Sequence, residues 1–234
     1  MKGNLPEHLN FKEDNSFSLS ISDLMSALLL IFILLLSGIL LKLAEQQELN
    51  QSQLDLISEQ QKAKRSIIEQ LKGEMDEFDI EVDPKTGVIR IKESILFDFG
   101  KSDIKPTGKV FLERFIPKYA EILLSKIEIR NQIGQIIIEG HTDNIGTYVN
   151  NLLLSLQRAN SVASIIFQND FHEFDTREEF QKRLSVNGRS FMNPISDNIT
   201  QENRRNNRRV EFKFSFVDWT TVQNEYMNEK LENE

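Results

Sequence analysis

The stretch GQIIIEGHTDNIGTYVNNLLLSLQRANSVASIIFQ, residues 134–168, decides the fold of this chain. It begins with a continuous apolar run that suits a buried strand, and the polar letters EGHTDN that follow predict a loop. From Asn150 onward, apolar residues recur at the spacing of an amphipathic helix. A buried strand followed by a loop and a helix predicts an α/β domain in which helices cover a sheet.

The flanking sequence continues this alternation of strands and helices. Upstream, FDIEVDPKTGVIRI (78–91) predicts a hairpin, and SILFDFGKSDIKPTG (94–108) predicts a strand that runs into a loop. Pro106 opens a predicted helix at residues 105–125. Downstream, FHEFDTREEFQKR (171–183) predicts a charged insert with a short helix, whereas RLSVNGRS and RRVEFKFSF predict the last two strands.

Composition restricts the function of the chain. Its 234 residues include no cysteine, which excludes disulfides, thiolate metal sites and a lipidated cysteine. The net charge of −8 argues against a nucleic-acid partner, and we interpret the basic cluster RRNNRR (204–209) as a bracing element of the domain. His141 has no second histidine or acid at ligand spacing, so we expect no metal. No nucleophile–base pair or phosphate loop is visible, so we expect no enzyme.

A long apolar stretch, SLSISDLMSALLLIFILLLSGILL (18–41), precedes the domain. A helix of about 23 residues is roughly 34 Å long and crosses a bilayer of about 30 Å. The segment before it, MKGNLPEHLNFKEDNSF, is mixed and slightly acidic, unlike the basic start of a cleaved signal peptide. We therefore expect a single uncleaved transmembrane helix.

One carboxylate, Asp23, lies about one turn inside this helix. In one interpretation it is an acid near the interface that the helix dipole favours. In the other it is an intramembrane ionisable residue that faces a protein partner or a water-filled cavity and takes up and releases a proton. A lone helix cannot shelter a carboxylate from lipid, so the second interpretation requires partner helices from another protein.

Residues 42–78 predict a helical linker, because they contain no proline and are rich in helix formers. A 4-3 ladder runs through them, and seven of its eleven positions are apolar. This pattern indicates either a parallel helix pair with a polar middle or a single solvated helix. The ladder positions are Leu43, Gln47, Asn50, Leu54, Ile57, Gln61, Lys64, Ile68, Leu71, Met75 and Phe78.

The region from about residue 80 to 217 resembles the OmpA-like peptidoglycan-binding domain. The family pattern is roughly TD-x-x-G, then N-x-x-L-S-x-x-R-A, then a strand carrying glycine, and finally R-x-x-N-R-R-V-E. LFDFGKSDIKPTG resembles the opening strand and loop of the family. The matching residues are Thr142, Asp143, Gly146, Asn151, Leu154, Ser155, Arg158, Ala159, Gly188, Pro194, Arg204, Asn207, Arg208, Arg209, Val210 and Glu211.

This resemblance implies a site for the diaminopimelate of peptidoglycan, which presents an ammonium and a carboxylate. Asp143 suits the ammonium and Arg158 can fork onto the carboxylate. Thr142, Asn151 and Leu154 match positions that shape the site. The structural alternative is an internal Asp143–Arg158 pair that braces the loop.

The order of parts, with SISDLMS around Asp23, resembles the MotB/ZorB family of rotary stator B subunits. The resemblance implies that Asp23 carries a proton, or alternatively sodium, and that no cofactor is needed. It implies a homodimer inside a pentamer of multi-spanning MotA/ZorA-like subunits, anchored to peptidoglycan. It places the chain in the bacterial inner membrane with a cytoplasmic N-terminus (1–17), the span (18–41), a linker or plug region (42–78), a periplasmic OmpA-like domain (79–217) and a tail (218–234).

Two branches of this family fit the sequence. One is the flagellar stator, and the other is the ZorB component of Zorya anti-phage systems. The chain is short, its N-terminus lacks the basic cluster common in the flagellar branch, and its span is poor in aromatic residues, so we favour the ZorB branch. A function of another class, a passive OmpA-like wall anchor without ion transport, leaves Asp23 unexplained.

Overall fold

The computed structural model describes residues 14–78 and 80–218 of the chain. The predicted N-terminal segment and C-terminal tail therefore lie almost wholly outside the described residues. The chain divides into two compact units, residues 1–58 and 59–234, and the long helix α1 (Asp14–Met75) belongs to both. Each unit is described by itself.

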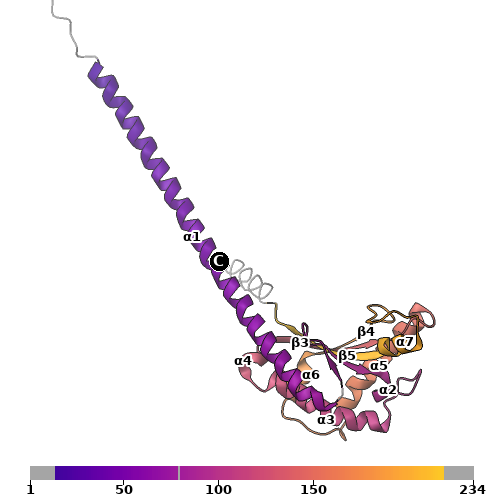
Figure 1. The fold of residues 1–234 in the computed structure, drawn as a ribbon. Coiled ribbons are helices and arrows are strands. Elements are labelled where there is room, and N and C mark those ends of the chain that lie inside the picture. The colour runs from indigo at the N-terminus through magenta and orange to yellow at the C-terminus, as the bar shows by residue number, and fades with distance from the viewer. Residues whose placement is uncertain (1–13, 79, 219–234) are drawn as a thin grey trace, which may run out of the picture. The chain divides into compact units, whose positions relative to one another are not determined.

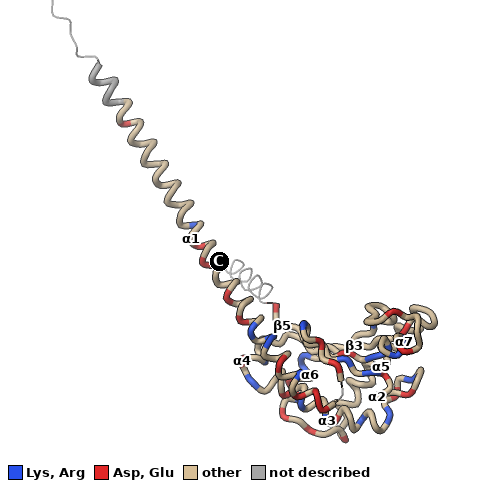
Figure 2. The backbone as a smooth tube through the Cα atoms, viewed as in Figure 1, with Lys and Arg blue, Asp and Glu red and all other residues tan. Residues whose placement is uncertain are grey.

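In the first unit, α1 contains an 18-residue stretch with a mean hydropathy of 2.9 and no buried side chain. Within the described residues, this is the one helix long and apolar enough to cross a membrane. All side chains at positions 21–50 are exposed, Asp23 among them. Lysine and arginine are absent between Lys12 and Lys42, and most of this stretch is uncharged in Figure 2. The predicted span thus coincides with a continuous helix.

The second unit is the predicted α/β domain, built on a five-stranded sheet with strand order β1-β2-β5-β3-β4 (Figure 1). Strands β3 and β4 are parallel and the other neighbours are antiparallel. The strands are β1 (Glu81–Val82), β2 (Ile89–Lys92), β3 (Ile133–His141), β4 (Leu184–Gly188) and β5 (Arg209–Phe216). The helices are α2 (Glu93–Leu96), α3 (Pro106–Leu124), α4 (Ile127–Arg130), α5 (Tyr148–Ile166), α6 (Arg177–Arg183) and α7 (Gln201–Asn207), and a 3-10 turn, η1, covers Asp76–Phe78.

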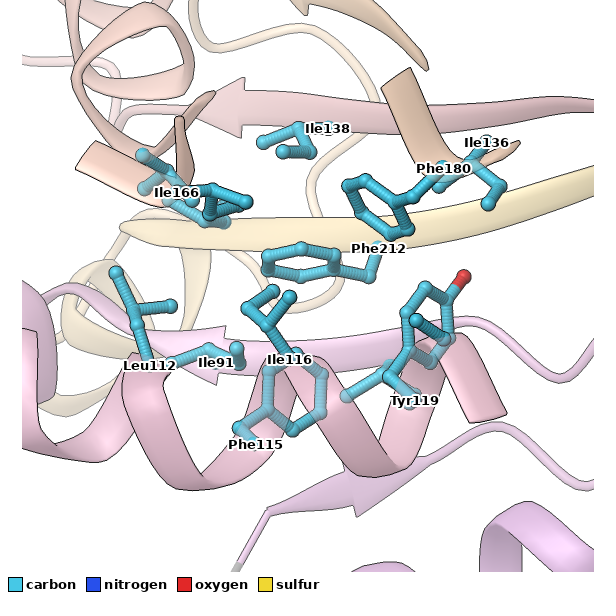
Figure 3. Close-up of a cluster of buried hydrophobic side chains, with 14 of the residues drawn as sticks. Ile91, Leu112, Phe115, Ile116, Tyr119, Ile136, Ile138, Ile166, Phe180 and Phe212 are labelled. Atoms are coloured by element: carbon cyan, nitrogen blue, oxygen red, sulfur yellow. The ribbon is translucent and has the colours of Figure 1, made fainter. Parts of the chain in front are cut away.

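Alternation along the strands gives the sheet two different faces. On β3 and β5 the registered pairs Ile138–Phe212 and Ile136–Phe214 point to one face, where helices cover them. Phe212 lies at the centre of this core, with its ring 5.0 Å from that of Phe115 and 5.6 Å from that of Tyr119 on α3 (Figure 3). The apolar face thus provides the core that the alternating pattern predicted.

The opposite face of the sheet carries charged residues at the intervening positions. There Glu139 pairs in register with Glu211, and Glu211 in turn with Arg90 of β2. The carboxyl groups of Glu139 and Glu211 are both buried. A cavity of about 680 Å³ is lined by Arg90, Lys92 and Arg209 of this charged face, among others, and by none of the predicted peptidoglycan-binding residues.

The C-terminal part of α1 packs into the same core. Leu71, Met75 and Phe78, the last three apolar ladder positions, are buried with the residues of α3 and the sheet, and so is Ile67, which is not a ladder position. The ladder position Ile68 is also buried, but outside this core cluster. Leu71, Met75 and Phe78 therefore pack inside the domain and are not available to pair with a second copy of α1. The earlier ladder positions Leu43, Leu54 and Ile57 remain exposed.

Most of the predicted elements are confirmed, with three exceptions. The strand predicted at the start of SILFDFGKSDIKPTG is wrong: Glu93–Leu96 form the one-turn helix α2, and only Phe97 makes an isolated bridge, to Ile104. The sequence also gave no sign of α4 or of α7, the second of which places a helix within the RRNNRR cluster. All three helices are too short to show a full apolar period.

Candidate functional site

Four segments that are far apart in the sequence meet at the carboxyl end of β3. The loop after β3 supplies Thr142 and Asp143, α5 supplies Arg158, α2 supplies Glu93, and the residue before β5 is Arg208. Gly140 permits this approach, because a Cβ there would lie 2.0 Å from the Ser155 carbonyl oxygen on α5. Thr147 caps α5 by accepting a hydrogen bond from the Asn150 amide at 3.3 Å.

Arg158 is fully buried, although arginine is seldom found inside a domain. Its Nε donates to the Lys101 carbonyl oxygen at 2.9 Å, and its Nη2 donates to Glu93 Oε1 at 2.5 Å. Its guanidinium carbon lies 5.5 Å from the centre of the Phe97 ring. Burial lowers the pKa of Arg158 below its ordinary value, against the opposing effect of Glu93. The remaining nitrogen, Nη1, is buried without a hydrogen-bond partner among the described residues.

Glu93 and Asp143 are joined through a second arginine, Arg208. Its Nε donates to Glu93 Oε2 at 2.5 Å, and its Nη1 donates to Asp143 Oδ2 at 2.6 Å. Arg208 also lies over the exposed ring of Phe99, with 5.0 Å between the guanidinium carbon and the ring centre. Two acids and two arginines therefore form one connected cluster whose formal charges cancel.

Asp143 and Arg158 thus lie in one cluster, but each is paired with a different residue. The simple internal Asp143–Arg158 pair considered above is not what the structure shows, since Arg158 bonds to Glu93 and Asp143 bonds to Arg208. Asp143 also accepts a hydrogen bond from the Ile145 amide at 3.1 Å, which holds the loop. The cluster presents an acid and a base together, as recognition of a ligand with both charges requires.

The other predicted site residues occupy three different environments. Thr142 is buried, and its Oγ1 has no hydrogen-bond partner in the described part of the chain. Asn151 is buried and donates to the Ile145 carbonyl oxygen at 2.9 Å, so it supports the same loop. Leu154 is half-buried on α5. Thr142 Oγ1 and Arg158 Nη1 are thus two buried polar atoms whose hydrogen-bonding capacity is not used by the described part of the chain.

Two members of this cluster were not predicted as site residues. Glu93 carries no motif, and its position in sequence gives no sign of contact with Arg158, which lies 65 residues away. Arg208 was noted only as part of the bracing cluster RRNNRR. That bracing prediction is confirmed for three arginines: Arg204 donates to two loop carbonyls, Arg208 bonds to two acids, and Arg209 bonds to Glu211.

The charged face of the sheet corrects the expectation that His141 has no acids at ligand spacing. Its Nε2 lies 3.1 Å from Glu139 Oε1 and 3.5 Å from Glu211 Oε2, and its Nδ1 lies 3.3 Å from the Met192 carbonyl oxygen. The sequence showed Glu139 two positions away, but only strand pairing brings in Glu211.

This arrangement does not fit a metal ion, although the three side chains have ligand atoms within 4.8 Å of one another. Glu139 accepts from Lys213 and, at 2.9 Å, from Arg189. Glu211 accepts from Arg209 at 2.6 Å and pairs with Lys213 at 2.9 Å. With Arg90, whose Nε lies 3.5 Å from Glu211 Oε1, four cations already neutralise the two carboxylates, so a metal would have to displace them.

Known proteins are similar to both parts of the chain. The OmpA family matches residues 96–208. Zorya protein ZorB from Escherichia coli is 28% identical over 212 residues, which cover 86% of this chain and 88% of that protein. Motility protein B from Bacillus subtilis is 34% identical over 128 residues, 53% of this chain and 43% of that protein. Thus the chain spans less than half of the length of that motility protein.

The fold has a counterpart among solved structures. A MotB-like protein from Desulfovibrio vulgaris is 23% identical, with a TM-score of 0.50, and the match covers 70% of this chain and 99% of that chain. The names Zorya protein ZorB and Motility protein B describe no enzymatic activity. The chain is therefore similar to the OmpA family over residues 96–208 and to Zorya protein ZorB over most of its length, and the match to the MotB-like protein concerns the fold.

Proposed function

We propose that this chain is the peptidoglycan-anchored B subunit of a proton-driven rotary motor in a bacterial inner membrane, of the Zorya anti-phage type. The observation that carries the proposal is the presence, in one chain, of an isolated carboxylate in an apolar helix and of a charged cluster that suits a zwitterionic ligand. The first is Asp23, and the second contains Asp143 and Arg158. The proposed topology is a cytoplasmic N-terminus and a periplasmic domain.

The proposed motor function rests on the isolation of Asp23. The next cation along the helix is Lys42, 19 residues away, or about 28 Å at 1.5 Å per residue. Within the described residues no cation pairs with Asp23. A carboxylate in the apolar region of a membrane is costly, so it is retained where a partner protein or water-filled cavity receives it. We therefore propose that two such helices lie inside five MotA/ZorA-like subunits, and that Asp23 carries the proton.

Proton binding at Asp23 provides a physical basis for rotation. The ionised carboxylate is attracted to polar or cationic groups of one surrounding subunit, and protonation removes that attraction. Release of the proton on the other side of the membrane restores the charge and favours the next contact. Because a five-fold ring cannot match a two-fold helix pair, the two Asp23 side chains bind out of phase and movement continues in one direction.

The proposed binding to the cell wall is based on the charged cluster in the OmpA-like domain. Diaminopimelate presents an ammonium and a carboxylate on one carbon, and the cluster offers both an acid and an arginine. Arg158 Nη1 is a buried donor that a ligand carboxylate can satisfy, and Asp143 can accept from the ammonium. Anchoring to the rigid wall would hold the B subunits still while the surrounding subunits turn.

The Zorya assignment is supported by the extent of similarity to ZorB. The match covers 86% of the chain, so about one residue in seven lies outside it. The number of residues outside the match is therefore smaller than the 58 residues of the N-terminal unit, so the match must extend into that unit. The flagellar alternative is supported by Motility protein B, which matches 53% of the chain.

The decisive experiment replaces Asp23 with asparagine, which keeps the size of the side chain but cannot carry the proton. The variant is expressed with its cognate multi-spanning subunit, and phage plating efficiency and membrane proton flux are measured. We expect both protection and flux to be lost, whereas binding to purified peptidoglycan is unchanged. Asp23→Glu, which keeps the carboxyl group, is the matched control and should retain part of the activity.

Each alternative predicts a different result. If Asp23→Asn protects as well as the wild type, the chain is a passive anchor and the motor proposal fails. If the wild type restores swimming to a strain that lacks its flagellar B subunit but gives no phage protection, the flagellar alternative is correct.

A further inference from the structure

Glu93 has a position that no motif of the sequence explains. It is the first residue of the one-turn helix α2 and is 5% exposed. Its amide donates to the Arg208 carbonyl oxygen at 3.0 Å, which fixes α2 against the start of β5. Its two carboxylate oxygens are divided between two arginines: Oε1 accepts from Arg158 and Oε2 from Arg208, each at 2.5 Å.

The contact with Glu93 determines which edge of Arg158 remains available. Nε is held by the Lys101 carbonyl and Nη2 by Glu93, while the guanidinium lies against Phe97. Only Nη1 lacks a partner among the described residues. A guanidinium held at two of its three nitrogens has little freedom to turn, so Nη1 has a fixed direction before a ligand arrives.

Glu93 also sets the net charge of the cluster. Asp143 alone would leave the two arginines with one uncompensated positive charge. With Glu93 the two acids balance Arg158 and Arg208, and all four groups are joined by hydrogen bonds. A neutral cluster with separate acidic and basic ends suits a zwitterion, whereas a cluster with an excess positive charge would favour a plain dianion.

We infer that Glu93 determines the specificity of the site for a zwitterionic amino-acid end, because it fixes Arg158 and Arg208 and cancels one of their two positive charges. This inference rests on the proposed peptidoglycan-binding function. Glu93 acts through the arginines, so it is a positioning residue. If Glu93 were only a buried structural anion, its loss would weaken the binding of all ligands by similar factors.

Two small ligands distinguish a role of Glu93 in specificity from a purely structural role. Diaminopimelate and pimelate have the same seven-carbon chain and two carboxylates, but pimelate lacks both ammonium groups. The full-length protein in detergent is titrated with each ligand, and binding is followed by ligand-observed NMR. The quantity of interest is the selectivity ratio, defined as the Kd for pimelate divided by the Kd for diaminopimelate.

The wild type should prefer diaminopimelate, and Glu93→Gln should lower the selectivity ratio by about tenfold or more. The size follows from the effect of one nearby charge, which commonly changes a proton affinity by one or more pKa units. Glu121→Gln, on an exposed position of α3, is the matched control and should keep the wild-type ratio. An unchanged ratio in Glu93→Gln, whatever the loss of affinity, would overturn the inference.

Arg208→Gln provides a test of opposite sign, which also applies if Glu93→Gln does not fold. It leaves the cluster with one excess negative charge, so the selectivity ratio should rise. A ratio that falls or stays constant contradicts the inference. If the wild type binds neither diaminopimelate nor purified peptidoglycan, the proposed function itself fails. If it binds peptidoglycan but does not prefer diaminopimelate, the function stands and the inference on Glu93 is wrong.

Discussion

The apolar helix of the first unit and the α/β domain of the second contain carboxylates in opposite situations. Asp23 is the one charged residue from 18 to 41, and the described side chains around it have no tertiary neighbours. In the domain, Glu93, Asp143, Glu139 and Glu211 are buried, and each accepts hydrogen bonds from cations of the same chain. The domain therefore compensates its own buried charges, whereas the helix does not.

This difference indicates whether the charged groups of each unit can act within the chain or need another protein. A buried acid that is paired within one chain can fix neighbouring side chains before a ligand binds, as Glu93 does for two arginines. A carboxylate such as Asp23, which pairs with no cation among the described residues, would need another protein to shelter it in a membrane. Folding and ligand binding of the domain can therefore be measured without a partner, whereas a test of the proposed role of Asp23 requires the proposed partner subunits.

The largest expected effect comes from adding one methyl group, which the domain cannot accommodate at Gly140 but the apolar helix can accommodate at Gly38. Gly140→Ala would place a Cβ 2.0 Å from a backbone oxygen of α5, so we expect it to destabilise the domain by more than about 4 kcal/mol. Gly38→Ala is the matched change in α1, where no atom lies within 4 Å, and it should not reduce helix content. Circular dichroism during thermal unfolding measures both. A Gly140→Ala protein with wild-type stability would contradict the close approach.

The next largest effect concerns the buried pairs of the domain. Arg158→Met removes a partner of the buried Glu93, and we expect the free energy of unfolding to fall by about 3 kcal/mol. Combined with Glu93→Gln, the loss should be smaller than the sum of the single losses by about 1 kcal/mol or more, because the two residues are in contact. Urea unfolding measures all three variants. Strict additivity would show that the pair is not coupled.

A somewhat smaller effect concerns the charged face of the sheet. Burial would raise the pKa of Glu139, but hydrogen bonds from His141, Lys213 and Arg189 outweigh it and hold this pKa at about 2. Because the folded pKa is below the ordinary value of 4.5, Glu139 stabilises the fold above about pH 4.5. That contribution is lost as the pH falls from 4.5 towards 2.

Glu139→Gln should therefore lower the free energy of unfolding at neutral pH by on the order of 2 kcal/mol, because solvent near the partly exposed Arg189 and Lys213 screens the pairs, and it should flatten the decrease in acid. Urea unfolding at several pH values between about 3 and 7 measures both effects. Glu178→Gln, at the exposed start of α6, is the control and should leave the pH profile unchanged. If Glu139→Gln retains the full acid sensitivity of the wild type, Glu139 is not paired as described.

The smallest expected effect concerns the start of α5. Thr147→Ala removes the side-chain oxygen that accepts the Asn150 amide, and we expect a loss of about 1 kcal/mol in the free energy of unfolding. Thr147→Ser keeps the oxygen and should stay close to the wild type. A loss as large as that of Arg158→Met would mean that the cap holds the site loop as well as the helix.

Sequence reasoning predicted the elements that have a full apolar period. It predicted β3 and α5 around the site because their patterns are local, and it placed α3 from the proline at its start. It missed α2, α4 and α7, which are four, four and seven residues long, because so few residues cannot distinguish a helical from an extended period. The ladder in α1 showed a helix but not what covers it, and its last positions pack in the domain.

The sequence by itself determined the apolar helix with its single carboxylate and the α/β class of the domain, and it predicted Asp143 and Arg158 as site residues. These features depend on composition, periodicity and short motifs, which are local properties of the chain. Only the tertiary structure decided that Glu93 and Arg208, 115 residues apart, complete the charged cluster. It also decided that Glu211 joins His141, because strand pairing brings together side chains whose separation in sequence gives no sign of contact.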